Sequence, residues 1–487
     1  MKFYTLLFSA ILSLICTAQA TVQPASMFGD HMVLQREMPV PIWGTAEPGE
    51  KISVTFGDAS ANGIADQDGK WMVTLPALKA SDKGRELTIK GSTTVTIKDV
   101  LVGEVWICSG QSNMQYGWGK ESHPMFNWGK APGLPELAEE AKTLPIRCFN
   151  VIPDVSFTEN DSCQGEWSTQ LPGSAVAFGF SYHLQKALNI PVAVIVTCWG
   201  SSSIEGWMPL DMKDQLPHFK EMMTRFDGAD SEARKKVEEA QAKGISHKMV
   251  FVRKQPNLLY NAMLHPVIPY ASRGFIWYQG EANGGQPDQY KESFPLWLKR
   301  IRKEWNQDSL HFMAVMLPGF GKDNGHPESK SWAQFRDAQM SILNEPNTAV
   351  ANTIDLGDVK NIHPPDKAPI AERLSLLARS NVYGEEIVHQ GPLFEKASVD
   401  SDKMVITFKH AEGLKTRDQE APRGFWLSDK EGKWHEANAS IKGETIMLSA
   451  EGVESPTACR YAWAGKPDVN LVNKASLPAY PFKTDSP

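Results

Sequence analysis

Ser112 is the residue whose type and setting most clearly fit nucleophilic chemistry. It follows the apolar run Val105–Cys108 at the start of the next predicted helix, and Gly110 between them permits a tight turn. A serine hydroxyl becomes a nucleophile when a base removes its proton, and the free N–H groups of a helix start can stabilise the resulting oxyanion. The same spacing fits a serine that only caps the helix, so position alone leaves both roles open.

Other reaction classes find no support in the sequence. We find no C-x-x-C pair, no H-E-x-x-H motif and no phosphate-binding glycine loop, so we expect neither a metal nor a nucleotide cofactor. The net charge of −7 comes from scattered charges, which argues against a nucleic-acid partner.

The region around Ser112 alternates between predicted strands and helices. This alternation indicates a doubly wound parallel sheet with helices on both faces. We expect buried strands at 102–108, 192–197, 274–278 and 312–316, and amphipathic helices such as 178–188 and 293–305. Segment 226–254 is rich in Glu, Lys and Ala, and we interpret it as an inserted, solvated helix and not as a binding segment.

Short alternating strands separated by turn residues occupy both ends of the chain. We therefore predict an N-terminal β-sandwich domain at 21–98, a catalytic α/β domain at 99–388 and a C-terminal β-rich region at 389–487.

Residues 1–20 have the features of a secretory signal peptide. Lys2 precedes a short apolar run, and Ala18-Gln19-Ala20 offers a cleavage site after Ala20. We expect a secreted or periplasmic protein without a membrane span, because no later apolar run reaches about 18 residues. In such an oxidising compartment Cys148 and Cys163, which are close in sequence, could pair.

The segment Gly110–Met114 resembles the nucleophile block of the sialate O-acetylesterase family, within the SGNH hydrolases. Further similar blocks follow in order along nearly the whole mature chain, at 27–36, 199–207, 259–263, 277–283, 460–463 and 477–482. The resemblance implies an SGNH-type α/β domain flanked by β-rich regions, and a serine esterase with Ser112 as nucleophile.

The resemblance also implies an oxyanion hole. Its donors would be the N–H groups of Ser112 and Gly200 and an amide side chain, either Gln279 or Asn283. The sequence does not separate these two amides, and Glu281 between them is expected to be structural.

His363 lies in a segment that resembles the histidine block of the family, and we predict that it is the base. The usual carboxylate before this histidine is missing, because Lys360 and Asn361 occupy the two positions where it would stand. The Asn361 backbone carbonyl could orient the imidazole ring, or Asp358 could reach it, so the third member of the triad stays open.

The family favours O-acetylated sialic acids as substrates, with acetylxylan or another acetylated polysaccharide as the alternative. Arg336 is a candidate for binding the carboxylate of a sialic acid, although a structural salt bridge is equally plausible for it, and Trp207 is a weaker candidate contact. A non-catalytic carbohydrate-binding protein is the alternative from another class, and the presence of both Ser112 and His363 argues against it.

Overall fold

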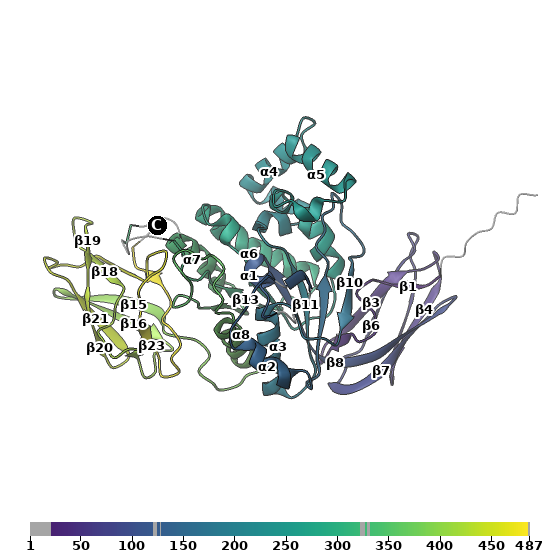
Figure 1. The fold of residues 1–487 in the computed structure, drawn as a ribbon, viewed down its shortest axis with the longest axis horizontal. Helices are drawn as coiled ribbons and strands as arrows, with labels where there is room; N and C mark the ends of the chain where they lie inside the picture. The colour runs from purple at the N-terminus through teal and green to yellow at the C-terminus, as the bar shows by residue number, and fades with distance from the viewer. Residues whose placement is uncertain (1–20, 120–123, 127, 322–326, 329–331, 486–487) are drawn as a thin grey trace, which may run out of the picture.

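The computed structural model describes residues 21–119, 124–126, 128–321, 327–328 and 332–485. Two β-rich regions flank a central α/β region along the long axis of the molecule (Figure 1). The predicted signal peptide, residues 1–20, lies outside the described residues. Within the described ranges, no helix has both the length and the apolar character needed to cross a membrane.

The central sheet has the strand order β10-β9-β11-β8-β12-β13-β14. All neighbours are parallel except β10, which pairs antiparallel with β9 at one edge. The predicted parallel sheet is thus confirmed in its centre, and three further strands, β9, β10 and β14, add to the four predicted ones. Their bounds are β8 Thr94–Gly110, β9 Ile146–Val151, β10 Gly165–Ser168, β11 Val192–Cys198, β12 Gly274–Tyr278, β13 His311–Val315 and β14 Thr348–Ala351.

Helices cover both faces of this sheet, as the alternation of side chains along its strands shows. Trp106 of β8 packs against Phe180 of α3 on one face, and Trp277 of β12 packs against Trp297 of α6 on the other. Helices α3 and α8 pack together, as do α6 and α7. The helices are α2 Leu134–Ala141, α3 Ala175–Leu188, α6 Pro287–Glu304, α7 Trp332–Met340 and α8 Ala368–Asn381.

Strand β8 joins the N-terminal β region to the central sheet. Its first half pairs with β7 and its second half with β11 and β12, so the expected domain boundary at residue 98 falls inside one continuous strand (Figure 1). The other N-terminal strands are β1 Gln23–Pro24, β2 Val33–Gln35, β3 Val40–Thr45, β4 Lys51–Phe56, β5 Ala59–Ile64, β6 Lys70–Leu75 and β7 Ser81–Lys90.

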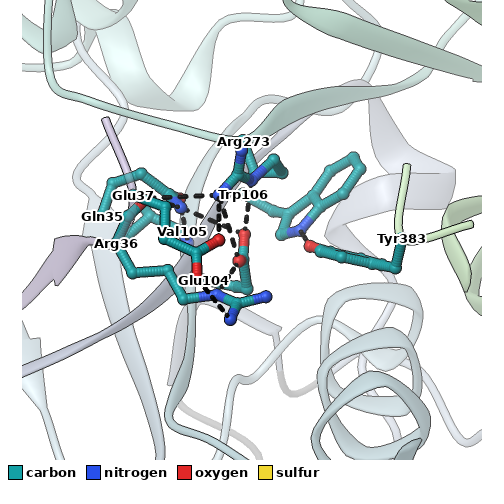
Figure 2. Close-up of polar contacts among 8 residues, drawn as sticks. All are labelled: Gln35, Arg36, Glu37, Glu104, Val105, Trp106, Arg273 and Tyr383. Atoms are coloured by element: carbon teal, nitrogen blue, oxygen red, sulfur yellow. Dashed lines mark hydrogen bonds and ion pairs between the residues drawn. The ribbon is translucent and has the colours of Figure 1, made fainter. Parts of the chain in front are cut away.

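A buried ion cluster fastens this junction (Figure 2). Glu104 of β8 is fully buried and pairs with both Arg36, which follows β2, and Arg273, which precedes β12. Gln35 donates a further hydrogen bond to the Glu104 carboxylate at 3.1 Å. The charge of Glu104 is therefore compensated from both the N-terminal region and the central sheet, as a buried carboxylate requires.

The C-terminal region contains two four-stranded sheets, of orders β15-β16-β21-β20 and β19-β18-β22-β24. Phe394 and Phe408 of the first sheet contact Phe482 of the second, at ring distances of 4.6 and 5.9 Å. The strands are β15 Leu393–Asp400, β16 Lys403–Lys409, β17 Lys415–Thr416, β18 Phe425–Ser428, β19 Trp434–Glu436, β20 Asn438–Lys442, β21 Thr445–Ser449, β22 Ala458–Tyr461, β23 Leu471–Val472 and β24 Phe482–Lys483.

An insertion after β11 stands apart from the sheet (Figure 1). It contains the helices α4 Pro217–Asp227 and α5 Glu232–Ala242, followed by short 3₁₀ turns at Ser246–Lys248 and Val252–Lys254. The predicted solvated helix at 226–254 is thus present only as α5. The end of that segment contacts the turn after β11, where Arg253 Nη1 donates to the Gly200 carbonyl.

Cys148 and Cys163 do not form the disulfide that their spacing suggested. Cys148 is buried in β9 and its thiol contacts the Gln170 carbonyl, whereas the Cys163 thiol lies beside Ser26 and Met27. Antiparallel pairing of β9 with β10 sets the positions of these residues, which nearness in sequence does not reveal.

Candidate active site

Ser112 stands at the carboxyl end of β8, where the chain turns into the short helix α1, Ser112–Gln115. The turn requires Gly110, which has φ +139° and whose absent Cβ would lie 2.1 Å from the Tyr278 carbonyl oxygen. Ser112 begins α1, so its N–H has no helical partner, and no other hydrogen bond to it occurs among the described residues.

His363 lies in the loop between β14 and α8, far from Ser112 in sequence. Its Nε2 is 2.8 Å from Ser112 Oγ, within the range expected for a base and its nucleophile. Burial lowers the pKa of His363, and the nearby positive charge of Lys367 lowers it further. The imidazole is therefore neutral near neutral pH, and in the tautomer that carries the proton on Nδ1 its Nε2 accepts from the Ser112 hydroxyl.

Two side chains hold the loop on either side of this histidine. Asn113, the neighbour of Ser112, donates from Nδ2 to the Ile362 carbonyl at 3.0 Å. Lys367 donates from Nζ to the Pro364 carbonyl at 2.6 Å and to Asn113 Oδ1 at 2.7 Å. Asn113 is thus connected to the Ile362 carbonyl directly and to the Pro364 carbonyl through Lys367. These bonds on both sides of His363 fix its position.

Two buried ionisable groups, Lys367 and Glu281, contact Asn113. Lys367 is fully buried, which lowers its pKa, and its ammonium group lies 4.6 Å from the centre of the Tyr116 ring. Glu281 accepts a hydrogen bond from Asn113 Nδ2, and burial raises the pKa of its carboxyl group. Glu281 therefore makes the hydrogen-bonding contacts expected of a structural residue, beside the nucleophile.

Neither candidate for the third member contacts the histidine ring in the described part of the chain. Asp358 accepts from the N–H groups of Lys360 and Asn361, and the Asn361 side chain accepts from the His363 N–H at 2.9 Å. The two expectations, an Asn361 carbonyl on the ring or Asp358 reaching it, are thus corrected: both residues shape the loop backbone, because short polar side chains bond most readily to nearby N–H groups.

Gly200 follows β11 and comes directly beside the nucleophile. A Cβ added to Gly200 would lie 3.3 Å from Ser112 Cβ, so only glycine leaves ordinary room there. Its N–H donates to Gln115 Oε1 at 3.0 Å. The Gly200 N–H lies beside Ser112, but a substrate carbonyl oxygen must displace Gln115 Oε1 before it can accept from this N–H.

The side-chain amides of Gln279 and Asn283 both donate to other protein groups. Gln279 Nε2 donates to the Ser202 carbonyl and to Asn283 Oδ1, while Asn283 Nδ2 donates to both carboxylate oxygens of Glu205. Neither amide has an unused N–H for an oxyanion, which corrects that expectation. They support the turn after Gly200, whereas Gln111 has its Nε2 3.5 Å from Ser112 Oγ.

A cavity of about 860 Å³ opens over Ser112. Its walls come from α1, Trp128, the turn after β11, residues 152–154 with Gln164, and the insertion from Gln241 to Arg253. Besides Ser112, the residues that line it include Gln115, Trp128, Trp199, Gly200, Ser201 and Arg253. Trp128 is 44% exposed and its ring stands edge-on to His363 at 5.2 Å.

The sequence interpretation missed Asn113, Lys367, Trp128 and Arg253. Asn113 lies inside the matched block and was the only one with a local signal. Arg253 belongs to the segment interpreted as solvated, and only its fold brings it to the cavity. No cluster of His, Cys, Asp or Glu suited to a metal ion occurs among the described residues.

Arg336 and Trp207 do not line the cavity. Arg336 is fully buried and donates to the carbonyls of Leu317, Ala464 and Gly465, which joins α7 to the C-terminal region. Trp207 is also fully buried, and its indole N–H donates to Ser202. Both residues are therefore structural, which corrects their assignment as substrate contacts.

Comparisons with known proteins agree on one kind of enzyme. Residues 240–371 match a family model described as carbohydrate esterase, sialic acid-specific acetylesterase. The chain is 28% identical to the sialate O-acetylesterase of Mus musculus and 27% identical to that of Homo sapiens, over 94% of this chain and 93% and 91% of those relatives. Its fold is similar to the crystal structure of a carbohydrate acetylesterase from Xanthomonas citri, with a TM-score of 0.80 and 32% identity over 95% of this chain and 99% of that one.

Proposed function

Since this chain belongs to the sialate O-acetylesterase family of carbohydrate acetylesterases and is a carboxylic ester hydrolase, we propose that it removes O-acetyl groups from sugars through an acetyl-serine intermediate. The observation that carries the proposal is the 2.8 Å contact between His363 Nε2 and Ser112 Oγ at the base of the cavity. Membership of an esterase family sets aside the alternative of a non-catalytic binding protein.

In the first half of the reaction, neutral His363 takes the Ser112 proton on Nε2 as Oγ bonds to the acetyl carbonyl carbon. The N–H groups of Ser112 and Gly200 stabilise the oxyanion, and Gln115 turns away from Gly200 as the substrate oxygen arrives. Collapse of the intermediate breaks the bond to the sugar oxygen, which leaves with the proton from His363.

In the second half, a water molecule gives its proton to His363 and attacks the acetyl-serine. Collapse of the second tetrahedral intermediate releases acetate and returns the proton to Ser112 Oγ. Asn113 and Lys367 bond to backbone carbonyls of the His363 loop and keep this loop at the nucleophile throughout both halves. Related triads use a carboxylate on the histidine ring to position the base.

For the sugar, we propose O-acetylated sialic acid, and acetylated xylan is the second candidate. The exposed ring of Trp128 beside His363 supports a sugar substrate, because an aromatic face gives apolar contact to a ring whose hydroxyl groups stay solvated. The polar walls of the cavity supply the hydrogen bonds that orient such a ligand.

The test is acetate release from a panel of O-acetylated sialic acids and acetylated xylo-oligosaccharides. We expect the wild-type protein to release acetate from the sialic acids fastest, and Ser112→Ala to release none above background. A wild-type protein that cleaves simple acetyl esters but no acetylated sugar would contradict the proposal.

We further propose that residues 1–20 are a signal peptide cleaved after Ala20 and that the mature enzyme acts outside the cytoplasm. Mass spectrometry of the N-terminus of the mature protein tests this, and a chain that still begins at Met1 would overturn it.

A further inference from the structure

Arg253 is an arginine that the insertion brings to the wall of the cavity. Its Nη1 donates to the Gly200 carbonyl at 3.1 Å and its Nη2 to the His247 carbonyl at 2.8 Å. The guanidinium carbon lies 4.8 Å from the centre of the Trp199 ring. These contacts fix the plane of the guanidinium group beside the turn that carries Gly200.

No carboxylate neutralises Arg253 among the residues that the structure describes. Arg36, Arg273 and Arg373, which are also largely buried, each pair with an acidic side chain. Among the described residues, the hydrogen bonds of Arg253 go only to carbonyl groups, and its Nε atom is buried without a hydrogen-bond partner. Such a cation is costly to bury unless an anion completes its shell.

The other charged group on the cavity wall does not supply that anion. Asp154 is exposed, and its carboxylate accepts a hydrogen bond from the Val155 N–H. Its charge is solvated and it forms no ion pair with Arg253 in the described part of the chain. After the two bonds to carbonyl groups, one N–H of Nη1 and one of Nη2 have no partner among the described residues, so these two donors are left for a ligand.

We infer that Arg253 binds a carboxylate of the substrate, so that the enzyme selects acidic O-acetylated sugars over neutral ones. A guanidinium held flat presents two parallel N–H groups, which match the two oxygens of a carboxylate. Arg253 bonds to Gly200, Gly200 lies beside Ser112, and all three residues line the same cavity, which places this subsite and the nucleophile in one cavity. The inference rests on the proposed function and names the substrate class within it.

The decisive comparison uses one sugar in two forms: an O-acetylated sialic acid and its carboxyl methyl ester. Both carry the same acetyl group, and only the free acid carries the negative charge. We expect the wild-type protein to hydrolyse the acid with a kcat/KM about ten- to a hundredfold higher than the methyl ester, mainly through KM, which corresponds to a charge-assisted pair of hydrogen bonds.

Arg253→Gln should remove this preference, with a loss of about ten- to a hundredfold on the acid and a much smaller loss on the methyl ester. Arg253→Lys keeps the charge without the fork and should retain part of the preference. The matched control is Arg225→Gln on α4, which is exposed and pairs with Glu221 one turn away, and should behave as wild type.

Equal wild-type rates on the acid and the methyl ester would overturn the inference and leave the proposed function standing. Equal losses on both substrates in Arg253→Gln would show that Arg253 only supports the Gly200 turn, and would overturn it too. Absence of acetate release from either sugar by the wild-type protein would refute the proposed function itself. The wild-type comparison needs no variant, so it holds even if Arg253→Gln folds poorly.

Discussion

At the scale of single residues, the site consists of a serine and a neutral histidine with no carboxylate on the ring in the described chain. Ser112→Ala should abolish esterase activity, and His363→Ala should lower kcat by several orders of magnitude, because the two residues act as one unit. Hydrolysis of a chromogenic acetyl ester measures both. Unchanged thermal unfolding is the control, and turnover near wild type in either variant would refute the assignment.

The loop residues before His363 should matter far less. Asp358→Ala and Asn361→Ala each remove hydrogen bonds to backbone N–H groups, worth about 1 kcal/mol apiece, so we expect kcat to fall only about fivefold. A residue that oriented the ring directly would cost up to about 10⁴-fold. Measured kcat values with the same ester decide between these roles, and a loss near the larger figure would identify the missing third member.

The pH profile follows from the pKa of His363. Burial and Lys367 lower this pKa, and the base works only when neutral, so kcat/KM should stay constant above about pH 6.5 and fall below it. We expect the midpoint of this acid limb to lie below the pKa of free imidazole. A midpoint above that value would mean that an anion stabilises the imidazolium form.

At the scale of elements, α1 and the loop before α8 are joined by Asn113 and Lys367. Lys367→Met removes the bond to Pro364 and a positive charge near His363. We therefore expect a lower kcat together with an acid limb moved to higher pH, since the repulsion that lowers the His363 pKa is lost.

The control for that prediction is Lys360→Met, an exposed lysine in the same loop, which should change neither quantity. A purely structural role of Lys367 would lower kcat without moving the limb. Steady-state kinetics from about pH 5 to 8 separate the two outcomes.

At the scale of the whole molecule, Glu104 joins the N-terminal region to the central sheet (Figure 2). Glu104→Gln keeps the shape but leaves Arg36 and Arg273 without their shared counterion, so the free energy of unfolding should fall by about 3 kcal/mol. Urea unfolding measures this change. Glu37→Gln, which removes an exposed partner of Arg36, should cost less than about 1 kcal/mol, and equal effects would contradict the role of burial.

The sequence by itself predicted the strands around the nucleophile, whereas the resemblance to a known family, and not the local pattern, singled out Ser112 and His363. Apolar runs indicate buried strands, and Gly110 indicates a turn, because strand formation and turn formation depend largely on neighbours along the chain. The same local reasoning predicted the β-rich ends, but it placed a domain boundary inside the continuous strand β8.

Only the tertiary structure decided which polar groups meet. Gln279 and Asn283 have the donors that an oxyanion needs, but the fold assigns those donors to Ser202 and Glu205. Nothing in the sequence separates Arg336 from Arg253 as a candidate for binding a carboxylate. In the fold, Arg336 is fully buried against backbone carbonyls, whereas Arg253 lines the cavity. A hydrogen bond belongs to two groups, and when these lie on distant segments, only packing brings them within 3.5 Å of one another or keeps them apart.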